Sequence, residues 1–449
     1  MINKKRLIFF LIFVFLYNCS FDKKTGIWDG DKKEKRRISE LEQKQKNIID
    51  VYKIYTSENI YSKNIVLKES IALSKPINAT SWKMNNLNHQ NFLGNIYLSA
   101  ANNFFLKKKI GKNKFSLYKM KSSLLASKNY IIFSDDTGTI FNINDIGKIN
   151  WKKNIYKKVY KKIYKNLTLS IHDNNIYVAD NIGFIYAINL NSGKTIWIKN
   201  HGKPLKSNIK IFNDKIFLID QDNQIICLDA NDGSRIWNVV SISSFIKSQN
   251  LMSLALTEKG NLIALNSSAD LFNINSNNGS VYWATNTLGS LYTDAADFFK
   301  SSDIVISDEE IIFSTSSSIF SYNLKNGFVN WNAKAQSAST PIVDGKNVFF
   351  VTDNGYFVII NKNTGKIISS SNILKILKKR HQETKITGFI MGSGKIYAVT
   401  LNGNLIVSSA ITGRVEYFKK IGDPITTPPI IKDGKLYILT ENSRIIGLN

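Results

Sequence analysis

The sequence predicts an all-β fold, namely an eight-bladed β-propeller built from four-stranded blades. Three observations lead to this prediction. One short motif recurs along the chain, alternating apolar strands surround each copy, and the last copy lacks its final strand. Recurrence of one strand-rich unit at a roughly constant period is typical of propellers, in which each blade is one unit.

The recurring motif is a turn glycine followed four residues later by an aromatic residue. It is clearest in "GFIYAINLNSGKTIW", which ends at Trp197, and in "QIICLDANDGSRIW", which ends at Trp237. Successive turn glycines lie 38 to 48 residues apart. The copies are Gly147/Trp151, Gly193/Trp197, Gly233/Trp237, Gly279/Trp283, Gly327/Trp331, Gly365/Ser369 and Gly413/Tyr417.

Each unit contains three antiparallel strands joined by tight turns. In residues 174–200, alternating runs at Ile176–Ala179 and Phe184–Leu190 precede Asn-Ser-Gly and a third run. The glycine supplies the positive φ that such a hairpin needs, and an Asn or Asp four residues earlier can bond to amides of the turn. These residues are Asn189, Asp229, Asn275, Asn323 and Asn361.

The aromatic residue is expected to cover the seam between neighbouring blades, because a large flat side chain buries much apolar surface there. We call its place, four residues after the turn glycine, the docking position. The predicted docking residues are Trp151, Trp197, Trp237, Trp283, Trp331 and Tyr417, and the ring closure described next adds Trp82.

Closing the ring requires one more strand, because the last unit stops at Arg444–Asn449 without an outer strand. The segment 78–86, which contains Trp82 without a preceding glycine, is expected to supply it. Such a clasp removes an open sheet edge and joins the chain ends. Seven internal units and one shared unit then make eight blades, and seven blades is the alternative.

The first residues have the form of an export signal. Basic residues at 4–6 precede the apolar run Leu7–Leu16 and then Cys19, and the run is too short for a membrane-spanning helix. The sequence "LYNCS" resembles a lipoprotein cleavage site, so Cys19 is the predicted lipidation residue, and cleavage by an ordinary signal peptidase is the alternative. We expect a signal peptide at 1–18, a charged tether at 19–75 and the propeller at 76–449.

The chain is strongly basic, with 60 Lys and Arg against 34 Asp and Glu and a formal net charge of +26. Nucleic acid is not an expected partner, because an exported chain rarely meets it and the lysines are spread among Ile and Asn. The densest run, "WKKNIYKKVYKKIYK" at 151–165, suits the solvated edge of an outer strand. Attraction to an acidic partner or to anionic lipid head groups is a secondary consequence of this charge.

The pattern Ala-x-Asn-x-x-x-Gly-x-x-x-Trp at 187–197 is similar to the tryptophan-docking repeat of quinoprotein-type propellers. Together with the signal, Cys19 and the eight-blade count, it makes the whole chain resemble the BamB family of lipoproteins. That resemblance implies a non-catalytic scaffold without a cofactor, anchored by lipid at the periplasmic face of the outer membrane. It also implies docking on the POTRA domains of a BamA-type barrel protein, with other assembly-machine subunits and unfolded outer-membrane proteins as further candidate partners.

The same resemblance implies two partner-binding loops. In "SISSFIKSQN", Ile246 and Lys247 fall where the family has a Leu-Arg pair, so an apolar anchor and a cation are kept while the arginine fork is replaced by a point charge. In "TDAADFFKSSD", Asp297 and Asp294 align with an acidic loop of the family, whose second carboxylate would fall at Phe299. An ordinary solvated loop is the alternative for each of these residues.

Two other classes of function remain open at this stage. A PQQ-dependent periplasmic dehydrogenase shares the blade motif, but this chain has no adjacent cysteines, and its four histidines show no metal-ligand spacing. Cys227, inside an apolar strand, is expected to be a small buried side chain. A periplasmic adaptor or sensor propeller would share every feature derived from the residues alone.

Overall fold

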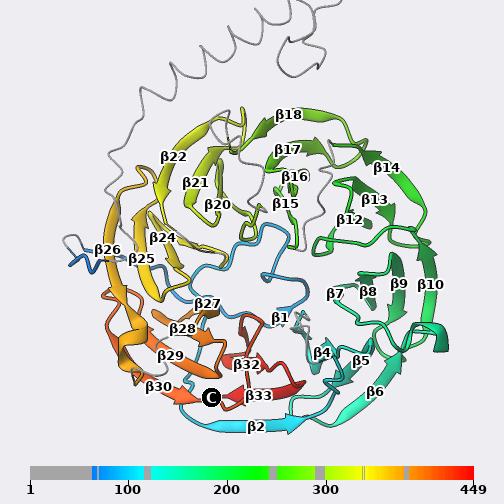
Figure 1. The fold of residues 1–449 in the computed structure, drawn as a ribbon, viewed down its shortest axis with the longest axis horizontal. Coiled ribbons are helices and arrows are strands. Elements are labelled where there is room, and N and C mark those ends of the chain that lie inside the picture. The colour runs from blue at the N-terminus through cyan, green and yellow to red at the C-terminus, as the bar shows by residue number, and fades with distance from the viewer. Residues whose placement is uncertain are drawn as a thin grey trace, which may run out of the picture. The chain divides into compact units, whose positions relative to one another are not determined.

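The protein is an eight-bladed β-propeller. A computed structural model describes residues 63–67, 70–115, 123–241, 250–288, 299–335, 337, 339–378 and 384–449, all within one compact unit, Thr56–Asn449. Eight antiparallel sheets surround a central axis, which confirms the predicted fold and the larger of the two blade counts (Figure 1). Among the described residues, no helix has the length and apolar character needed to span a bilayer.

Blades 1 to 4 follow one another along the chain. Blade 1 holds β3 (Leu125–Ser127), β4 (Tyr130–Ser134), β5 (Thr139–Ile143) and β6 (Ile149–Asn154), with β1 (Ser81–Trp82) beside β3. Blade 2 holds β7 (Leu167–His172), β8 (Asn175–Asp180), β9 (Phe184–Asn189) and β10 (Thr195–Asn200). Blade 3 holds β11 (Lys210–Phe212), β12 (Lys215–Ile219), β13 (Ile225–Asp229) and β14 (Arg235–Val239). Blade 4 holds β15 (Ser253–Leu256), β16 (Asn261–Leu265), β17 (Asp270–Asn275) and β18 (Val281–Asn286).

Blades 5 to 8 complete the ring. Blade 5 holds β19 (Val305–Ser307), β20 (Glu310–Ser314), β21 (Ser318–Asn323) and β22 (Val329–Lys334). Blade 6 holds β23 (Ile342–Asp344), β24 (Asn347–Val351), β25 (Tyr356–Asn361) and β26 (Ile367–Asn372). Blade 7 holds β27 (Ile386–Gly392), β28 (Lys395–Thr400), β29 (Asn404–Ser409) and β30 (Val415–Lys420). Blade 8 holds β31 (Ile430–Lys432), β32 (Lys435–Leu439), β33 (Arg444–Leu448) and β2 (Phe104–Lys109).

The turn before each outer strand has the predicted chemistry. Gly193 has φ +67° and Gly233 has φ +72°, a backbone region that glycine enters without strain. The side chain of Asn189 accepts hydrogen bonds from the backbone amides of Asn191 and Ser192. Because the same turn recurs, each outer strand begins in the same register against its neighbour.

The docking tryptophans contact the following blade. Trp151 lies over Gly193 and Trp197 over Gly233, so closely that a Cβ on either glycine would come within 2.8 Å of the indole. The glycine is therefore needed for two reasons: it adopts the positive φ of the turn, and its lack of a Cβ lets the indole ring approach the backbone closely. The indole N–H groups of Trp151, Trp197, Trp237, Trp283 and Trp331 donate to the carbonyls of Leu190, Ala230, Ser276, Leu324 and Lys362, at 2.5–3.0 Å.

Blades 6 and 7 lack tryptophan at the docking position. In blade 6, Ser369 takes that place and is buried, and the neighbouring Ser371 hydroxyl donates to the carbonyl of Gly413 in blade 7 (3.1 Å). In blade 7, Tyr417 pairs with Val407 in the same register as the tryptophans and is half-buried. The ammonium group of Lys419, two residues further along, donates to the carbonyl of Asn102. These two seams therefore include polar contacts from residues outside the docking position.

The ring is closed by an N-terminal strand, as predicted, but the strand is not the one that contains Trp82. Strand β2 pairs with β33 and becomes the outer strand of blade 8, whereas Trp82 pairs with Ala126 at the inner edge of blade 1. In register, Leu106 holds the docking position and packs on Gly147, the turn glycine of blade 1. A search for tryptophan misses this strand, because leucine holds its docking position.

The residues before β2 cross the centre of the ring. We call residues 70–101 the central segment, drawn in blue in Figure 1. It contacts the inner part of all eight blades, where sequence alone predicted a tether up to residue 75 and an outer strand at 78–86. The contacts for blades 1 to 8 are Trp82 with Ala126, Lys83 with Ile171, Asn85 with Lys210, His89 with Leu256, Gln90 with Ile306, Ser74 with Asp344, Ile96 with Gly392 and Ala79 with Asp433.

The apolar core lies between neighbouring blades. One cluster joins Tyr177 and Ile185 of blade 2 to Ile216 and Ile226 of blade 3, and the next joins blade 3 to blade 4. Cys227 belongs to the second cluster and is fully buried, as expected from its strand. Since each cluster belongs to two blades, the stability of each blade depends on its neighbours.

We predict that Trp237→Ala lowers the free energy of unfolding by about 3–5 kcal/mol, because a buried ring is removed from the seam between blades 3 and 4. Trp237→Phe, which keeps an aromatic ring but leaves the Ser276 carbonyl without its donor, should cost about 1–3 kcal/mol. Phe418→Ala, at an exposed ring on the outer strand of blade 7, is the control and should change stability by roughly 0.5 kcal/mol or less. Denaturant unfolding measures all three, and equal losses for Trp237→Ala and Phe418→Ala would contradict the docking role.

Candidate functional site

A central cavity of about 450 Å³ opens at one face of the ring. Its walls come from the residues at which the inner strands begin, including Asp303, Phe389 and Pro428. The central segment supplies Trp82 and Asn86 on the inner side. The same segment contacts the far ends of the inner strands, so the cavity is accessible from one face. We call this the open face.

The central segment turns sharply at an asparagine-rich stretch, residues 84–91. Asn86, Leu87 and Asn91 have φ of 55°, 72° and 58°, and asparagine tolerates this left-handed region better than most residues. The Asn91 side-chain amide, fully buried, donates to the carbonyls of Leu254 and Ile304, at 3.0 and 2.7 Å. One side chain thus ties the segment to blades 4 and 5.

A buried lysine supports this turn from blade 3. Lys210, 1% exposed, directs its ammonium group to the carbonyls of Asn85 and Asn88, both at 2.9 Å, and to the side-chain oxygen of Asn91. Burial lowers the pKa of Lys210 to about 7, and the charge of Asp303 opposes that shift. The pKa of His89 is also lowered, first by burial and then by Lys210. Keeping Lys210 charged in this buried place therefore lowers the free energy of unfolding.

Asp303 is one of the carboxylates in the described cavity wall. One of its oxygens accepts hydrogen bonds from the side-chain amides of Asn85 (2.8 Å) and Asn86 (2.7 Å) in the central segment, and the other accepts from the side-chain amide of Asn208 in blade 3 (3.5 Å). On another part of the wall, Gly388 lies so close to Pro428 that a Cβ would come within 2.6 Å of backbone. The wall is therefore tightly packed where blades 7 and 8 meet.

The predicted partner-binding residues lie outside the described residues. Ile246 and Lys247 fall within 242–249, and Asp294 and Asp297 fall within 289–298; Cys19 also lies outside the described part of the chain. The first loop rejoins the described chain at Asn250 and the second at Phe299. Asn250 and Lys300 line the cavity. The described chain therefore resumes at the open face after each of the two ranges.

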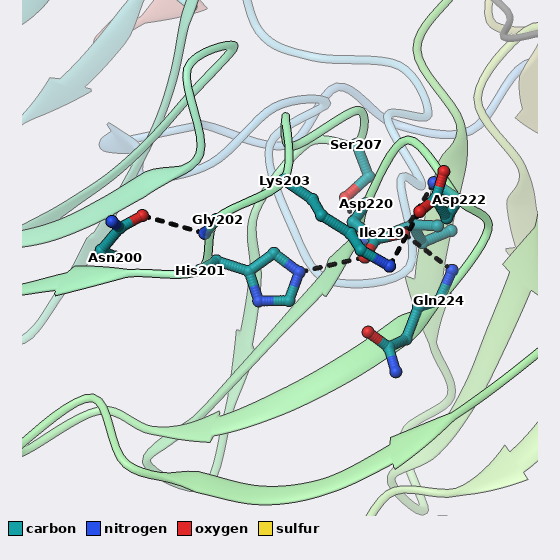
Figure 2. A network of polar contacts seen from close by, with 9 residues as sticks. All are labelled: Asn200, His201, Gly202, Lys203, Ser207, Ile219, Asp220, Asp222 and Gln224. Atoms are coloured by element: carbon teal, nitrogen blue, oxygen red, sulfur yellow. Dashed lines mark hydrogen bonds and ion pairs between the residues drawn. The ribbon is translucent and has the colours of Figure 1, made fainter.

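The open face is held in place by polar contacts between consecutive blades. Figure 2 shows one example: His201, which follows β10, forms a hydrogen bond of 3.0 Å with the buried carboxylate of Asp220 in blade 3. The other oxygen of Asp220 accepts from the backbone amides of Asp222 (2.8 Å) and Gln224 (3.0 Å). Lys203 pairs with Asp222 nearer the surface, at 2.8 Å. A loop that leaves one blade is thus fixed to the hairpin of the next.

The same arrangement recurs at the junction of blades 1 and 2. Tyr156, which follows β6, donates from its hydroxyl to Asp180 (2.6 Å), and the other Asp180 oxygen accepts from three amides of its own hairpin. Burial raises the pKa of Asp180 and, with the nearby carboxylate, that of the Tyr156 hydroxyl. Sequence reasoning missed these aspartates, although each stands at the end of an apolar strand just before a turn.

One group of surface side chains could hold a metal ion by distance alone. The Nε2 atom of His172 lies 3.0 Å from a carboxylate oxygen of Asp214 and 3.7 Å from one of Asp173. The two aspartate side chains are 66% and 80% exposed, so this is an ordinary surface contact between polar side chains. Sequence spacing could not reveal it, because the residues come from two blades.

The repeats themselves identify the family. Residues 136–371, more than half of the chain, match the family model described as "Outer membrane protein assembly factor BamB". The chain belongs to the BamB family. The matched region runs from the first hairpin of blade 1 to the outer strand of blade 6 and includes all five docking tryptophans described above.

Individual BamB relatives are distant in sequence. The chain is 24% identical to the outer membrane protein assembly factor BamB of Moranella endobia over 271 residues, which cover 56% of this chain and 66% of that protein. Across the first three curated BamB relatives, the alignments span 61–66% of the relatives' own length. The chain thus spans less than two thirds of the length of each of these three relatives.

Solved structures agree on the propeller. The crystal structure of BamB from Moraxella catarrhalis superposes with a TM-score of 0.61 at 11% identity, covering 76% of this chain and 99% of that one. A europium-containing methanol dehydrogenase superposes with a TM-score of 0.62 at 11% identity, covering 82% and 89%. At these identities the likeness concerns the fold alone, which BamB shares with an enzyme.

The buried lysine in this BamB-family propeller leads to a pH prediction. The pKa of Lys210 in the folded protein is about 7, below the ordinary lysine value, so between about pH 7 and 10 the unfolded chain binds more protons than the folded one. The free energy of unfolding should therefore rise with pH in this window. Relative to Lys210→Met, the wild type should gain roughly 2 kcal/mol between pH 7 and 9.

Denaturant unfolding at several pH values measures this difference, with Lys194→Met, at an exposed lysine, as the control. The control should follow the pH dependence of the wild type. Parallel curves for wild type and Lys210→Met would show that Lys210 keeps its proton throughout the window and that its three acceptors outweigh desolvation.

Proposed function

We propose that this protein is a non-catalytic scaffold lipoprotein of the machinery that assembles β-barrel proteins in the outer membrane. The observation that supports this most directly is the family match over residues 136–371, which covers the blades that carry the docking tryptophans. In this proposal the propeller contacts the periplasmic POTRA domains of a BamA-type barrel protein and other subunits of the machinery. It assists the insertion of barrel proteins without bond chemistry of its own.

The proposed contact surface is the open face, at the two loops that carry the predicted partner residues. Ile246 and Lys247 would supply an apolar anchor and a cation, and Asp294 and Asp297 would supply carboxylates from the next loop. The geometry supports one surface for both, because the loops rejoin the described chain in consecutive blades, at the cavity. Charged groups of opposite sign on one face favour a partner surface with a complementary charge pattern.

The main alternative is a quinone-dependent dehydrogenase, because a methanol dehydrogenase has a similar fold. The described cavity does not fit a quinone held through calcium, as that resemblance would require. Asp303 already accepts bonds from Asn85 and Asn86, and the central segment contributes Trp82 and Leu93 to the lining. The chain's two cysteines, Cys19 and Cys227, are far apart in sequence. These observations support the scaffold over the enzyme.

We predict that Ile246→Asp with Lys247→Glu reduces recovery of a POTRA-containing barrel protein at least about 10-fold. The first change replaces an apolar anchor with a carboxylate, and the second replaces a cation with an anion. The measurement is a mild-detergent pull-down of the tagged protein from its own membranes, quantified by mass spectrometry. The matched control is Ile198→Asp with Lys199→Glu, the same residue pair on the outer strand of blade 2, where Ile198 is 53% exposed.

The melting temperature of both double variants shows whether each propeller is folded. Equal recovery of the barrel protein with the loop variant and the wild type would remove this loop from the interface. If the wild type recovers an electron-transfer partner and the purified protein shows a quinone absorbance, the scaffold proposal would be wrong and a dehydrogenase would be the better-supported function.

The proposed location is the periplasmic face of the outer membrane, with acyl chains on Cys19 as the anchor. We predict that Cys19→Ser moves the protein from the membrane fraction to the soluble periplasmic fraction, because acyl chains supply most of the stable membrane affinity of a lipoprotein. Mass spectrometry of the wild type should show a mature N-terminus at Cys19 with acyl groups. An unmodified N-terminus at another residue would instead support cleavage by an ordinary signal peptidase.

A further inference from the structure

Two lysine-rich segments lie side by side on the open face, one between blades 8 and 1 and the other between blades 1 and 2. The first is residues 111–115, which follow β2, and the second is residues 156–165, between β6 and β7. The Phe115 and Tyr164 rings contact edge to face, with centroids 6.2 Å apart. We call the exposed lysines of these segments the lysine patch. They are Lys112, Lys114, Lys157, Lys158, Lys161 and Lys162.

The base of the lysine patch is built from buried contacts. The Lys165 side chain, 1% exposed, bonds to the carbonyl of Tyr160, and its ammonium group lies 5.1 Å from the Tyr156 ring centroid and 5.9 Å from that of Phe115. Asn181 of the next hairpin donates to the carbonyl of Tyr164 (3.2 Å). The segment is therefore held in shape, and its lysines are presented from a fixed base.

The outer side of the second segment also exposes aliphatic side chains. Val159 is 75% exposed and stands between two pairs of exposed lysines, and Ile163, 46% exposed, directly follows the second pair. Neither segment contains an acidic residue. Three carboxylates nearby, Asp135, Asp136 and Asp180, are buried beneath the segments and bonded to backbone amides, and the half-buried Glu441 is close enough to add to the effect of burial, which raises the pKa of Tyr164. Cations and aliphatic tips therefore share one exposed surface with no carboxylate of either segment to neutralise them.

We propose that the lysine patch binds the surface of an anionic phospholipid bilayer, with the ammonium groups at the phosphates and Val159 and Ile163 among the head groups. Lysines beside exposed aliphatic residues are typical of interfacial membrane contact, and each lysine near an anionic surface adds to the attraction. Protein interfaces, by contrast, favour arginine and disfavour lysine. The absence of arginine from both segments favours a lipid surface over an acidic protein.

This contact would be a second membrane signal beside the acyl chains predicted at Cys19. The acyl chains would supply most of the membrane affinity, and the patch would add to it and orient the bound domain. The patch lies at the junctions of blade 1 with blades 8 and 2, whereas residues 242–249 and 289–298 stand in the sequence between blades 3 and 4 and between blades 4 and 5. The proposal does not depend on the identity of the partner protein.

The test is cosedimentation of the full chain with vesicles, in a Cys19→Ser background so that acyl chains at that residue do not contribute. One set of vesicles contains phosphatidylglycerol in phosphatidylcholine, and the other contains phosphatidylcholine alone. The first set should bind the protein more tightly, and the difference should fall as salt is raised. Removing four patch lysines should weaken binding to the anionic vesicles at least about 10-fold. The variant combines Lys157→Gln, Lys158→Gln, Lys161→Gln and Lys162→Gln.

Two further variants make the result specific. A control that removes the same charge from four exposed lysines scattered over the propeller should bind as the wild type does; it combines Lys194→Gln, Lys346→Gln, Lys366→Gln and Lys420→Gln. Val159→Ser with Ile163→Ser should weaken vesicle binding several-fold while the salt dependence is kept, because insertion is lost and attraction remains. Melting temperatures of all variants check that the fold is intact.

Three results would overturn the proposal. Equal binding to both sets of vesicles would show that charge does not direct the contact. Equal losses in the patch variant and the scattered control would assign the attraction to net charge rather than to this site. Binding of soluble polyglutamate as tight as binding of anionic vesicles, with no effect of the Val159 and Ile163 changes, would make the patch a site for an acidic protein.

Discussion

The packing of one blade's indole ring on the turn of the next blade is the contact on which the rest of this structure depends. Each tryptophan buries its ring against a glycine and donates its N–H to a carbonyl of the same turn, so apolar burial and a hydrogen bond act at one place. Every blade supplies half of a seam and needs its neighbour for the other half. A chain built in this way must close, because an open first or last blade would leave a seam exposed. Strand β2 meets that requirement by carrying Leu106 onto Gly147.

The central segment adds a second set of contacts that is independent of the seams. It runs past all eight inner strands and meets them with backbone groups, asparagine amides and the Lys210 ammonium, rather than with a continuous apolar face. Polar groups suit this place, since the ends of the inner strands expose carbonyls and amides that need partners away from water. The cost is the desolvation of one lysine. The consequence is that the ring offers its cavity at the open face.

The open face therefore gathers the features that bear on function. Asn250 and Lys300, which precede the inner strands of blades 4 and 5, line the cavity, and the lysine patch lies at the junctions of blade 1 with blades 8 and 2. Polar contacts such as Tyr156 with Asp180 and His201 with Asp220 fix the connecting segments to the neighbouring hairpins. The proposed regions for lipid and for protein would suit a scaffold, which must hold partners in a fixed relation. Membership of the BamB family agrees with that role and leaves the particular partners to experiment.

The sequence by itself determined the repeated unit, the blade count and the fact that an N-terminal strand closes the ring. These follow from local rules, because turn glycines, Asx residues and strand alternation act over a few residues and recur in every blade. It could not determine which N-terminal strand closes the ring. Trp82 and Leu106 are both apolar and lie near each other in the chain, and only the size of the seam and the path of residues 70–101 decide between them. The cavity, the Lys210 contacts and the lysine patch also required the tertiary structure. Each joins residues from different blades, and contacts between distant parts of a chain leave no fixed spacing in its sequence.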